Sequence, residues 1–498
     1  MEYSNANQIE RMNEVENEIG KTKYNFPFKQ KKRTILIWIF GGILILVAII
    51  ILIVLLTKNR KSTKAPNKKE KEPSYICKEG KEECLICDKG KNLCTSCTSN
   101  YRLLNGRCYP IISFKAIYNI NSSSTINLIN SLPQYKYNEV STVLEMIVDN
   151  KNVEPSTNYS FSTPGYHTVQ FSINGFFENI SLTSMFSDII NLTSISFDKS
   201  FNTQPIRRMD KMFYNCISLK SIDFSNLNTE YVENMTGLFG FCSSLTSFDF
   251  SKLNTKNVRF MEKFFYFCES LTYINLTNIN TKNVINMQNM FTSCRLLTSI
   301  NLSKFNTENV ENMVGLFSNC YNLTSIDVSN FNTEKVKDMS SMFSGVRLTS
   351  LDLSNFKTHN VEYMSSMFTY ARKLKSINLS NFNTSKLKST HRMFYECNSV
   401  ESIDFSSFKA KIDHVDYLFK NCEYLKSIDL SGIKGAYSGV ETMFQGCFSL
   451  SSIDFSSFYV VDNKTFKSLP RLGSIKVNKD LVDRIKSLLP NWEVITVN

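Results

Sequence analysis

The sequence predicts an α/β solenoid made of repeats of 25 or 26 residues, with a parallel β-sheet on one face and short helices behind it. Cysteine recurs every 26 residues from Cys216 to Cys320, and the same position continues at similar spacing to Cys447. Phenylalanine stands three residues before each of these positions, and a segment such as LTSIDV at residues 323–328 follows them. A fixed period over ten units indicates repeats that stack on one another.

Each segment of the LTSIDV type is predicted to be a β-strand. Side chains alternate between the two faces of a strand, so Ile326 and Val328 should point into the core while Asp327 points to solvent. Successive repeats would then place their strands side by side as a parallel sheet.

The segment FNTENVENMVGLF, residues 305–317, is predicted to be the short helix behind the sheet. Val310, Met313 and Phe317 have the spacing of the buried face of a helix. Thr307 stands where an N-cap residue is expected. The methionine and phenylalanine positions therefore belong to the core.

The repeated cysteine position is predicted to be buried and reduced. Val346 and Ala371 occupy it in two repeats without disturbing the period, which is typical of a small apolar core position.

The outward strand position is the candidate ligand face. It holds a carboxylate or an amide in every repeat: Asp223, Asp249, Asn275, Asn301, Asp327, Asp352, Asn378, Asp404, Asp429 and Asp454. Such a row is either a solvated polar surface, or a surface for a cation such as calcium or for the hydroxyls of a glycan. Variable aromatic residues beside the phenylalanine and cysteine positions are either rim packing or exposed anchors: Tyr214, Phe241, Tyr266, Tyr321, Tyr370, Tyr395 and Tyr424.

The N-terminal part predicts a membrane anchor. Residues 34–56 are 23 residues without a charge, enough for about 34 Å of helix. We expect residues 1–33 to be a cytoplasmic tail and residues 57–76 a basic stalk. The cysteine-rich segment that follows favours an oxidising compartment, so the protein should be a single-pass plasma-membrane protein with its C-terminal part outside.

Residues 77–109 form a cysteine-rich module with few apolar residues. Its six cysteines are Cys77, Cys84, Cys87, Cys94, Cys97 and Cys108. Disulfides of undetermined pairing are the favoured interpretation, and zinc bound by the two CxxC pairs is the alternative. The pattern resembles the furin-like and EGF-like cysteine-rich repeats of protist surface proteins.

The remaining boundaries follow from changes in pattern. Residues 110–177 alternate apolar and polar side chains and predict a small β domain that caps the first repeat. The solenoid should occupy residues 178–470, with a C-terminal cap at 471–498. Candidate N-glycosylation sites are Asn121, Asn158, Asn179 and Asn191.

The repeat consensus NFNT-x-x-V-x-x-M-x-x-MF-x-x-C-x-x-L-x-SIDLS resembles the BspA-like leucine-rich repeats of bacterial and protist surface proteins. The resemblance covers about residues 185–477 and implies adhesion to host or matrix molecules. We therefore expect a surface recognition protein with an extracellular protein or glycan ligand. A structural surface coat without a specific ligand and a signalling receptor are the alternatives.

Charge and motifs argue against other classes of protein. Of the net charge of +12, residues 1–76 contribute +7 (14 Lys and Arg against 7 Asp and Glu). The remainder forms no long basic block, so we expect no nucleic-acid partner. The four histidines show no HExxH spacing, and no P-loop or GxSxG motif is present. We expect neither an enzyme nor a cofactor.

Overall fold

The computed structural model describes residues 84–88, 93–98, 101–104, 107–130, 143–174, 180–203, 206–405, 407–412, 415–434 and 439–497. The chain divides into two units, residues 1–75 and 76–498, and all described residues belong to the second. The predicted tail, membrane span and stalk lie outside the described residues, as does Cys77. Within the part of the chain that is described, no helix has the length and apolar character needed to cross a membrane.

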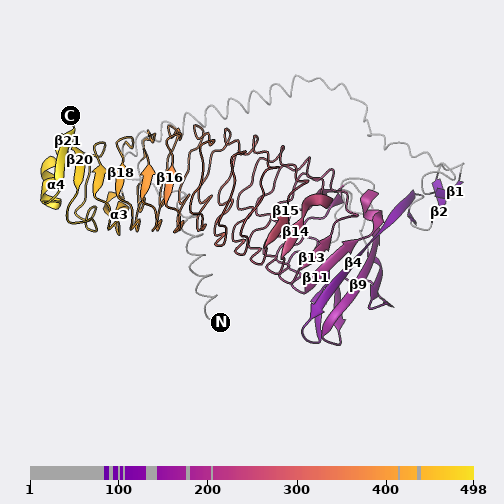
Figure 1. The fold of residues 1–498 in the computed structure, drawn as a ribbon. Coiled ribbons are helices and arrows are strands. Elements are labelled where there is room, and N and C mark those ends of the chain that lie inside the picture. The colour runs from indigo at the N-terminus through magenta and orange to yellow at the C-terminus, as the bar shows by residue number, and fades with distance from the viewer. Residues whose placement is uncertain are drawn as a thin grey trace, which may run out of the picture. The chain divides into compact units, whose positions relative to one another are not determined.

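The repeats form a β-solenoid whose coils follow one another from β11 to β21 (Figure 1). The strand at the SIDL position forms in most coils: β11 (Leu192–Phe197), β13 (Ser221–Asp223), β14 (Ser247–Asp249), β15 (Tyr273–Asn275), β16 (Ser376–Asn378), β17 (Ser402–Asp404), β18 (Ser427–Asp429) and β19 (Ser452–Asp454). Neighbouring strands pair in parallel, for example Ile377 opposite Ile403. In the three coils between β15 and β16 this position is extended without a strand ladder.

The prediction of short helices behind the sheet is wrong. In their place each coil has a run of tight turns, and the one short α-helix among the described residues there is α3 (Val440–Met443). Two residues per coil have left-handed backbone angles, such as Asn289 with φ 56° and Ser293 with φ 60°. Left-handed residues four positions apart end any right-handed helix between them.

Hydrogen bonding in these turns alternates between two directions. The N–H of Met290 donates to Met287 O at 3.2 Å within the coil, whereas the N–H of Phe291 donates to Leu316 O of the next coil at 3.0 Å. Every second N–H therefore joins one coil to the next. The turns keep the spacing of apolar residues that a helix would have. Half of the backbone hydrogen bonds, however, run between coils and not within one coil.

A second parallel ladder runs one residue before the first methionine of each repeat. Single bridges link Arg208, Asn234, Phe260, Asn286, Asn312, Asp338, Tyr363 and Ser389 in succession, and a further bridge joins Lys411 to Lys434. The short strands β10 (Ile180–Ser181) and β12 (Ile206–Arg208) begin this side of the solenoid. The 3₁₀ helices η1 (Lys199–Thr203) and η2 (Phe250–Lys252) lie in connections.

The predicted N-cap role of Thr307 is also wrong. Its hydroxyl donates to Asn332 O at 2.9 Å and accepts from Asn332 N at 2.7 Å, so it joins two coils. Thr281 makes the same pair of bonds one coil earlier, and Thr255 makes it two coils earlier. The threonine of the NFNT segment is thus a buried clip between coils, which we call the threonine clip.

The core is a stack of phenylalanines with the thiols beside it. Phe291 is fully buried, and its ring stacks 5.9 Å from Phe265 and 5.7 Å from Phe317. The thiol of Cys320 is buried and lies 3.1 Å from Phe291 O, to which it donates. The repeated cysteines Cys216, Cys242, Cys268, Cys294, Cys320, Cys397, Cys422 and Cys447 are all free and buried. Burial raises the pKa of the Cys320 thiol to about 12.

A small antiparallel sheet adjoins the first coil. Its strands are β3 (Tyr101–Leu104), β4 (Arg107–Ile120), β6 (Val143–Val148), β7 (Lys151–Val153) and β9 (Gly165–Asn174), with β5 (Ser124–Asn127) and β8 (Asn158–Phe161) as a separate pair. The long strand β4 lies between β9 and β11 and pairs antiparallel with both. The β domain thereby covers the sheet edge that β11 would otherwise expose.

The C-terminal residues extend the parallel sheet. β20 (Ser474–Asn478) pairs with β19 and with β21 (Glu493–Val497). The connection holds η3 (Lys479–Leu481) and α4 (Val482–Leu488). Trp492 is buried there, and its indole N–H donates to Pro470 O at 3.1 Å.

The cysteine-rich module contributes a two-stranded antiparallel sheet, β1 (Cys84–Asp88) and β2 (Leu93–Cys97). Disulfides join Cys84 to Cys94 and Cys97 to Cys108. Among the described residues, the sulfur atoms of Cys84, Cys94 and Cys108 form the one group of three ligand atoms that lie together, within 4.8 Å of one another. Because these sulfurs belong to disulfides, they supply no thiolate for the zinc alternative.

Candidate functional site

The predicted row of carboxylates and amides lies on the solvent side of the strands, but its oxygen atoms are used within the fold. The Oδ1 atom of Asp327 accepts from Ser329 N at 2.9 Å, and Asp352 accepts from Ser354 N at the same distance. The same contact, two residues along the chain, occurs at Asp223, Asp249, Asn275, Asn301, Asn378, Asp429 and Asp454. These residues therefore take part in the turn that follows the strand position of their coils.

This contact favours the charged form of Asp223, Asp249, Asp327 and Asp352. Hydrogen bonds from the hydroxyl and the backbone N–H of Ser329 lower the pKa of Asp327. The described carboxylates of the row do not converge into a group of three ligand atoms, so the calcium interpretation gains no geometric support. The structure places these residues in a row, and their binding of a ligand stays a prediction.

The candidate glycosylation sites differ in their surroundings. Asn121 and Asn158 are exposed. The Nδ2 atom of Asn191 donates a hydrogen bond to Asn119 O at 3.0 Å. Asn179 lies outside the described residues.

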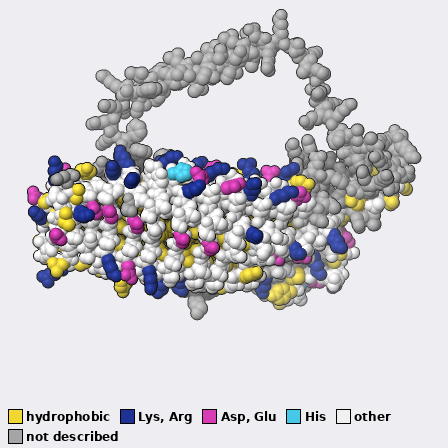
Figure 2. All heavy atoms as spheres, turned by 45° about the horizontal axis from the view of Figure 1, so that its top comes forward, with side chains coloured by type: hydrophobic (Ala, Val, Ile, Leu, Met, Phe, Trp, Pro, Cys, Tyr) yellow, Lys and Arg dark blue, Asp and Glu magenta, His cyan; other side chains and the backbone are white. Residues whose placement is uncertain are grey.

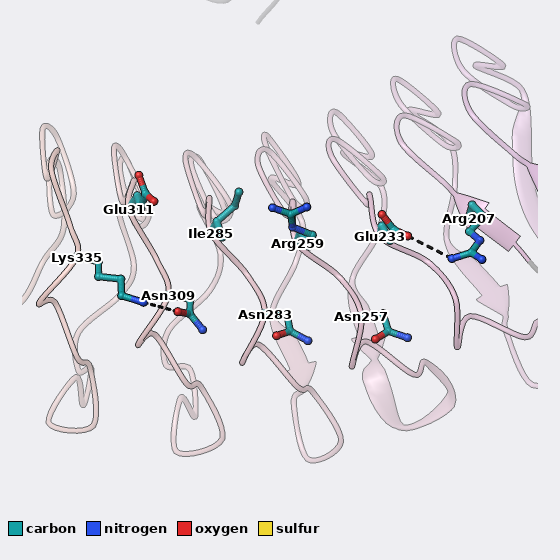
Figure 3. Close-up of a pocket in the computed structure, with 9 residues that line it drawn as sticks. All are labelled: Arg207, Glu233, Asn257, Arg259, Asn283, Ile285, Asn309, Glu311 and Lys335. Atoms are coloured by element: carbon teal, nitrogen blue, oxygen red, sulfur yellow. Dashed lines mark hydrogen bonds and ion pairs between the residues drawn. The ribbon is translucent and has the colours of Figure 1, made fainter. Parts of the chain in front are cut away.

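A groove of about 600 Å³ lies along a different part of the coils and is lined by Arg207, Glu233, Asn257, Arg259, Asn283, Ile285, Asn309, Glu311 and Lys335 (Figure 3). We call it the polar groove. Its side chains come in two rows, one residue before and one residue after the repeated valine of the consensus. Figure 2 shows charged side chains of both signs interspersed over one face of the molecule.

The row after the valine is held at regular spacing by the backbone. Arg259 N donates to Glu233 O, Ile285 N to Arg259 O and Glu311 N to Ile285 O, each at 2.9 Å. Successive side chains are therefore about 4.8 Å apart, the spacing of neighbouring strands.

The charges in this row alternate and pair along it. Arg207 lies 3.2 Å from Glu233, and Lys337 lies 2.5 Å from Glu311. Arg259 has Glu233 before it in the row and Ile285 after it. Ile285 stands where continued alternation would place an acidic residue. Arg259 makes no ion pair with a described residue; its guanidinium lies 5.7 Å from the centre of the Phe260 ring.

The other row supplies hydrogen-bond acceptors. Each amide nitrogen donates to the preceding coil, as from Asn257 to Glu230 O at 2.8 Å and from Asn283 to Lys256 O at 2.7 Å. This contact fixes the amide and leaves its oxygen on the groove side. The Oδ1 atom of Asn309 accepts from Lys335 at 2.6 Å, whereas those of Asn257 and Asn283 accept from no described residue.

The centre of the polar groove thus presents one guanidinium, two amide oxygens and the apolar side chain of Ile285. Donors and acceptors at fixed spacing suit an extended polar ligand that follows the solenoid. No residue there is arranged as a nucleophile with a base. Sequence reasoning missed this groove, although the alternating charges at 26-residue spacing from Arg207 to Lys337 were a readable signal.

The variable aromatic positions fall into two groups. Tyr266 is buried, whereas Tyr321 and Tyr370 are each 40% exposed and Tyr424 is 58% exposed. Tyr214, Phe241 and Tyr395 are partly buried. Packing and exposure are thus both found in this row.

These features define a repeat-solenoid protein with polar grooves between its coils. The repeats match the family described as "Mycoplasma protein of unknown function, DUF285" over residues 180–298, 267–376, 322–433 and 346–458. Together the matches span residues 180–458, more than half of the chain, and the chain belongs to this family. No curated protein matches it.

Proposed function

We propose that this chain is a cell-surface recognition protein that binds an extracellular glycan or protein through its solenoid. The observation that carries the proposal is the polar groove, in which Arg259 lacks an ion pair while the other charged residues of its row form the pairs Arg207–Glu233 and Lys337–Glu311. A guanidinium left without a counter-ion at the centre of a groove is a ready donor for a ligand carboxylate or hydroxyl. The resemblance to BspA-like surface proteins supports the same function.

The membrane anchor at residues 34–56 is part of this proposal. Disulfides at Cys84–Cys94 and Cys97–Cys108 support an oxidising location for the residues that follow it. Protease added outside intact cells should remove the solenoid and leave residues 1–33 protected. Protection of the solenoid instead would reverse the proposed orientation.

The binding test is an array of glycans and matrix proteins probed with the full-length protein. We expect saturable binding that Arg259→Glu weakens at least tenfold, because the substitution places a second acidic group beside Glu233. Lys304→Glu is the matched control, since Lys304 is exposed and lies outside the polar groove. Saturable binding that is equal in both variants would exclude this groove.

A structural coat without a specific ligand is the second candidate. It is favoured by the carboxylate and amide row, because that row is used in turns and not held open for a ligand. An array without any saturable signal would favour the coat. A signalling receptor is the third candidate, and no observation of the described residues favours it.

A further inference from the structure

A second groove, of about 640 Å³, lies where the connection from the cysteine position to the strand is one residue shorter than in the other coils. It is lined by Tyr321, Gly345, Val346, Arg347, Tyr370, Arg372 and Lys373. In each of the other coils two residues separate the cysteine position from the next apolar strand residue, as between Cys320 and Leu323. Only Arg347 separates Val346 from Leu348, so this coil lacks one residue of its rim.

Two tyrosines line the groove. Tyr321 comes from the preceding coil and Tyr370 from the following coil, and both are 40% exposed. The two phenols are near enough for Tyr321 to raise the pKa of Tyr370, after the larger effects of burial and of Glu396. We call this feature the tyrosine groove.

Gly345 forms part of the floor between these walls. A Cβ atom there would lie 3.1 Å from Cε1 of Tyr321 and 2.9 Å from Oδ1 of Asn319. Glycine thus lets the Tyr321 ring lie close to the floor.

The groove also carries an excess of positive charge. Arg372 pairs with Glu396 and lies over the Tyr370 ring at 5.2 Å, so its charge is partly compensated. Arg347 and Lys373 are exposed and form no ion pair with a described residue. Two cations without ion-pair partners beside two aromatic rings favour a ligand that carries an anionic group on a rigid ring with apolar faces.

We infer that the tyrosine groove binds an acidic sugar, a pyranose that bears a carboxylate or a sulfate. The C–H faces of a sugar ring fit between aromatic walls, its hydroxyls reach the tyrosine O–H groups, and its anion meets Arg347 and Lys373. The volume lies within the usual range for small-ligand sites. An acidic peptide offers the anion, but its carboxylate side chains have no rigid apolar face. The inference does not depend on the polar groove, because the two grooves share no residue.

The test measures binding of 3′-sialyllactose, 3′-sulfolactose and lactose to the full-length protein by calorimetry and saturation-transfer NMR. We expect saturable binding of at least one acidic sugar, weakened by salt, and at least tenfold weaker binding of neutral lactose. The two acidic probes separate carboxylate from sulfate recognition. Binding of lactose with equal affinity would overturn the inference, as would no binding of either acidic sugar.

Two variants locate the binding. Arg347→Ala combined with Lys373→Ala should weaken acidic-sugar binding at least tenfold, since it removes both free cations without altering the core. The matched control, Lys304→Ala with Lys467→Ala, also removes two exposed cations and should bind like the parent protein. Equal binding by the two double variants would show that the sugar is held elsewhere.

A third variant and a competitor complete the design. Tyr370→Ala should lose affinity for the sugar, whereas Arg259→Glu should keep it, which distinguishes this site from the polar groove. Displacement of the sugar by the peptide Glu-Tyr-Glu at equal concentration would assign the groove to acidic peptides and refute the sugar.

Discussion

Replacing Thr307 with valine tests whether the NFNT threonine joins coils. Valine has the same shape as threonine but lacks the hydroxyl, so packing is kept while both hydrogen bonds to Asn332 are lost. Thr307 is 1% exposed, and the hydroxyl of an N-cap would instead accept an N–H of its own coil.

The expected cost follows from these two bonds. A typical intramolecular hydrogen bond contributes about 0.5–1.5 kcal/mol, so losing two should lower the free energy of unfolding by about 1–3 kcal/mol. Thr307→Ser is the control, because serine keeps both bonds and loses one buried methyl group, at about 1 kcal/mol.

Urea denaturation and amide hydrogen exchange provide the assay. Thr307→Val should shift the urea midpoint more than Thr307→Ser, and the amide of Asn332 in the next coil should lose protection. If the two variants unfold alike, or if protection is lost at the amide of Asn309 within the same coil, the clip is refuted.

Three further outcomes are expected. Phe291→Ala should lower the free energy of unfolding by about 3–5 kcal/mol, because it removes a fully buried ring between two stacked neighbours. Asp327→Ala should shift the urea midpoint far less, and equal shifts would reverse the assignment of buried and exposed strand faces. Thiol reagents should label Cys320 only after denaturation, since burial raises the thiol pKa to about 12, and prompt labelling of the native protein would contradict this. Burial opposes charge on both His167 and Asp149, but their 2.7 Å contact outweighs it, raising the pKa of the histidine and lowering that of the aspartate. This pair should therefore stabilise the β domain fully between about pH 4 and pH 6.5, and this stabilisation should be lost as the pH rises through the raised pKa of His167. An NMR titration of His167 should give a midpoint above 6.5.

The repeat, its period and its buried positions were predictable because they depend on spacing alone. Ile377 and Leu379 alternate with exposed neighbours as a strand with one buried face requires, and the cysteine position is buried in every coil. These features depend on which residues recur, and recurrence is visible in the chain.

The turns behind the sheet could not be recognised from apolar spacing. Met287, Met290 and Phe291 have the spacing of a helix face, but Asn289 and Ser293 adopt left-handed angles and donate their own N–H groups to the next coil. The acceptors of these bonds are 25 residues away in the sequence. Short-range periodicity does not distinguish a helix from a turn ribbon stabilised by stacking.

The candidate site shows the same limitation. Exposure of Asp327 was predictable from strand alternation, but the bond from its carboxylate to Ser329 N requires the turn geometry. The polar groove depends on an exception, Ile285, in an otherwise alternating charged row. The tyrosine groove depends on one missing residue at Arg347. Both proposed grooves thus lie where the sequence departs from the repeat consensus. A consensus pattern does not contain these departures, so it could not predict the grooves.

Hydrogen-exchange footprinting with the strongest array ligand most directly tests whether the solenoid recognises a ligand through the polar groove. The account predicts that the ligand slows exchange in peptides between Arg207 and Lys335, and that Arg259→Glu abolishes this protection while Lys304→Glu retains it. Protection confined to the strand turns around Asp327, or no protection at a ligand concentration that saturates binding, would contradict it.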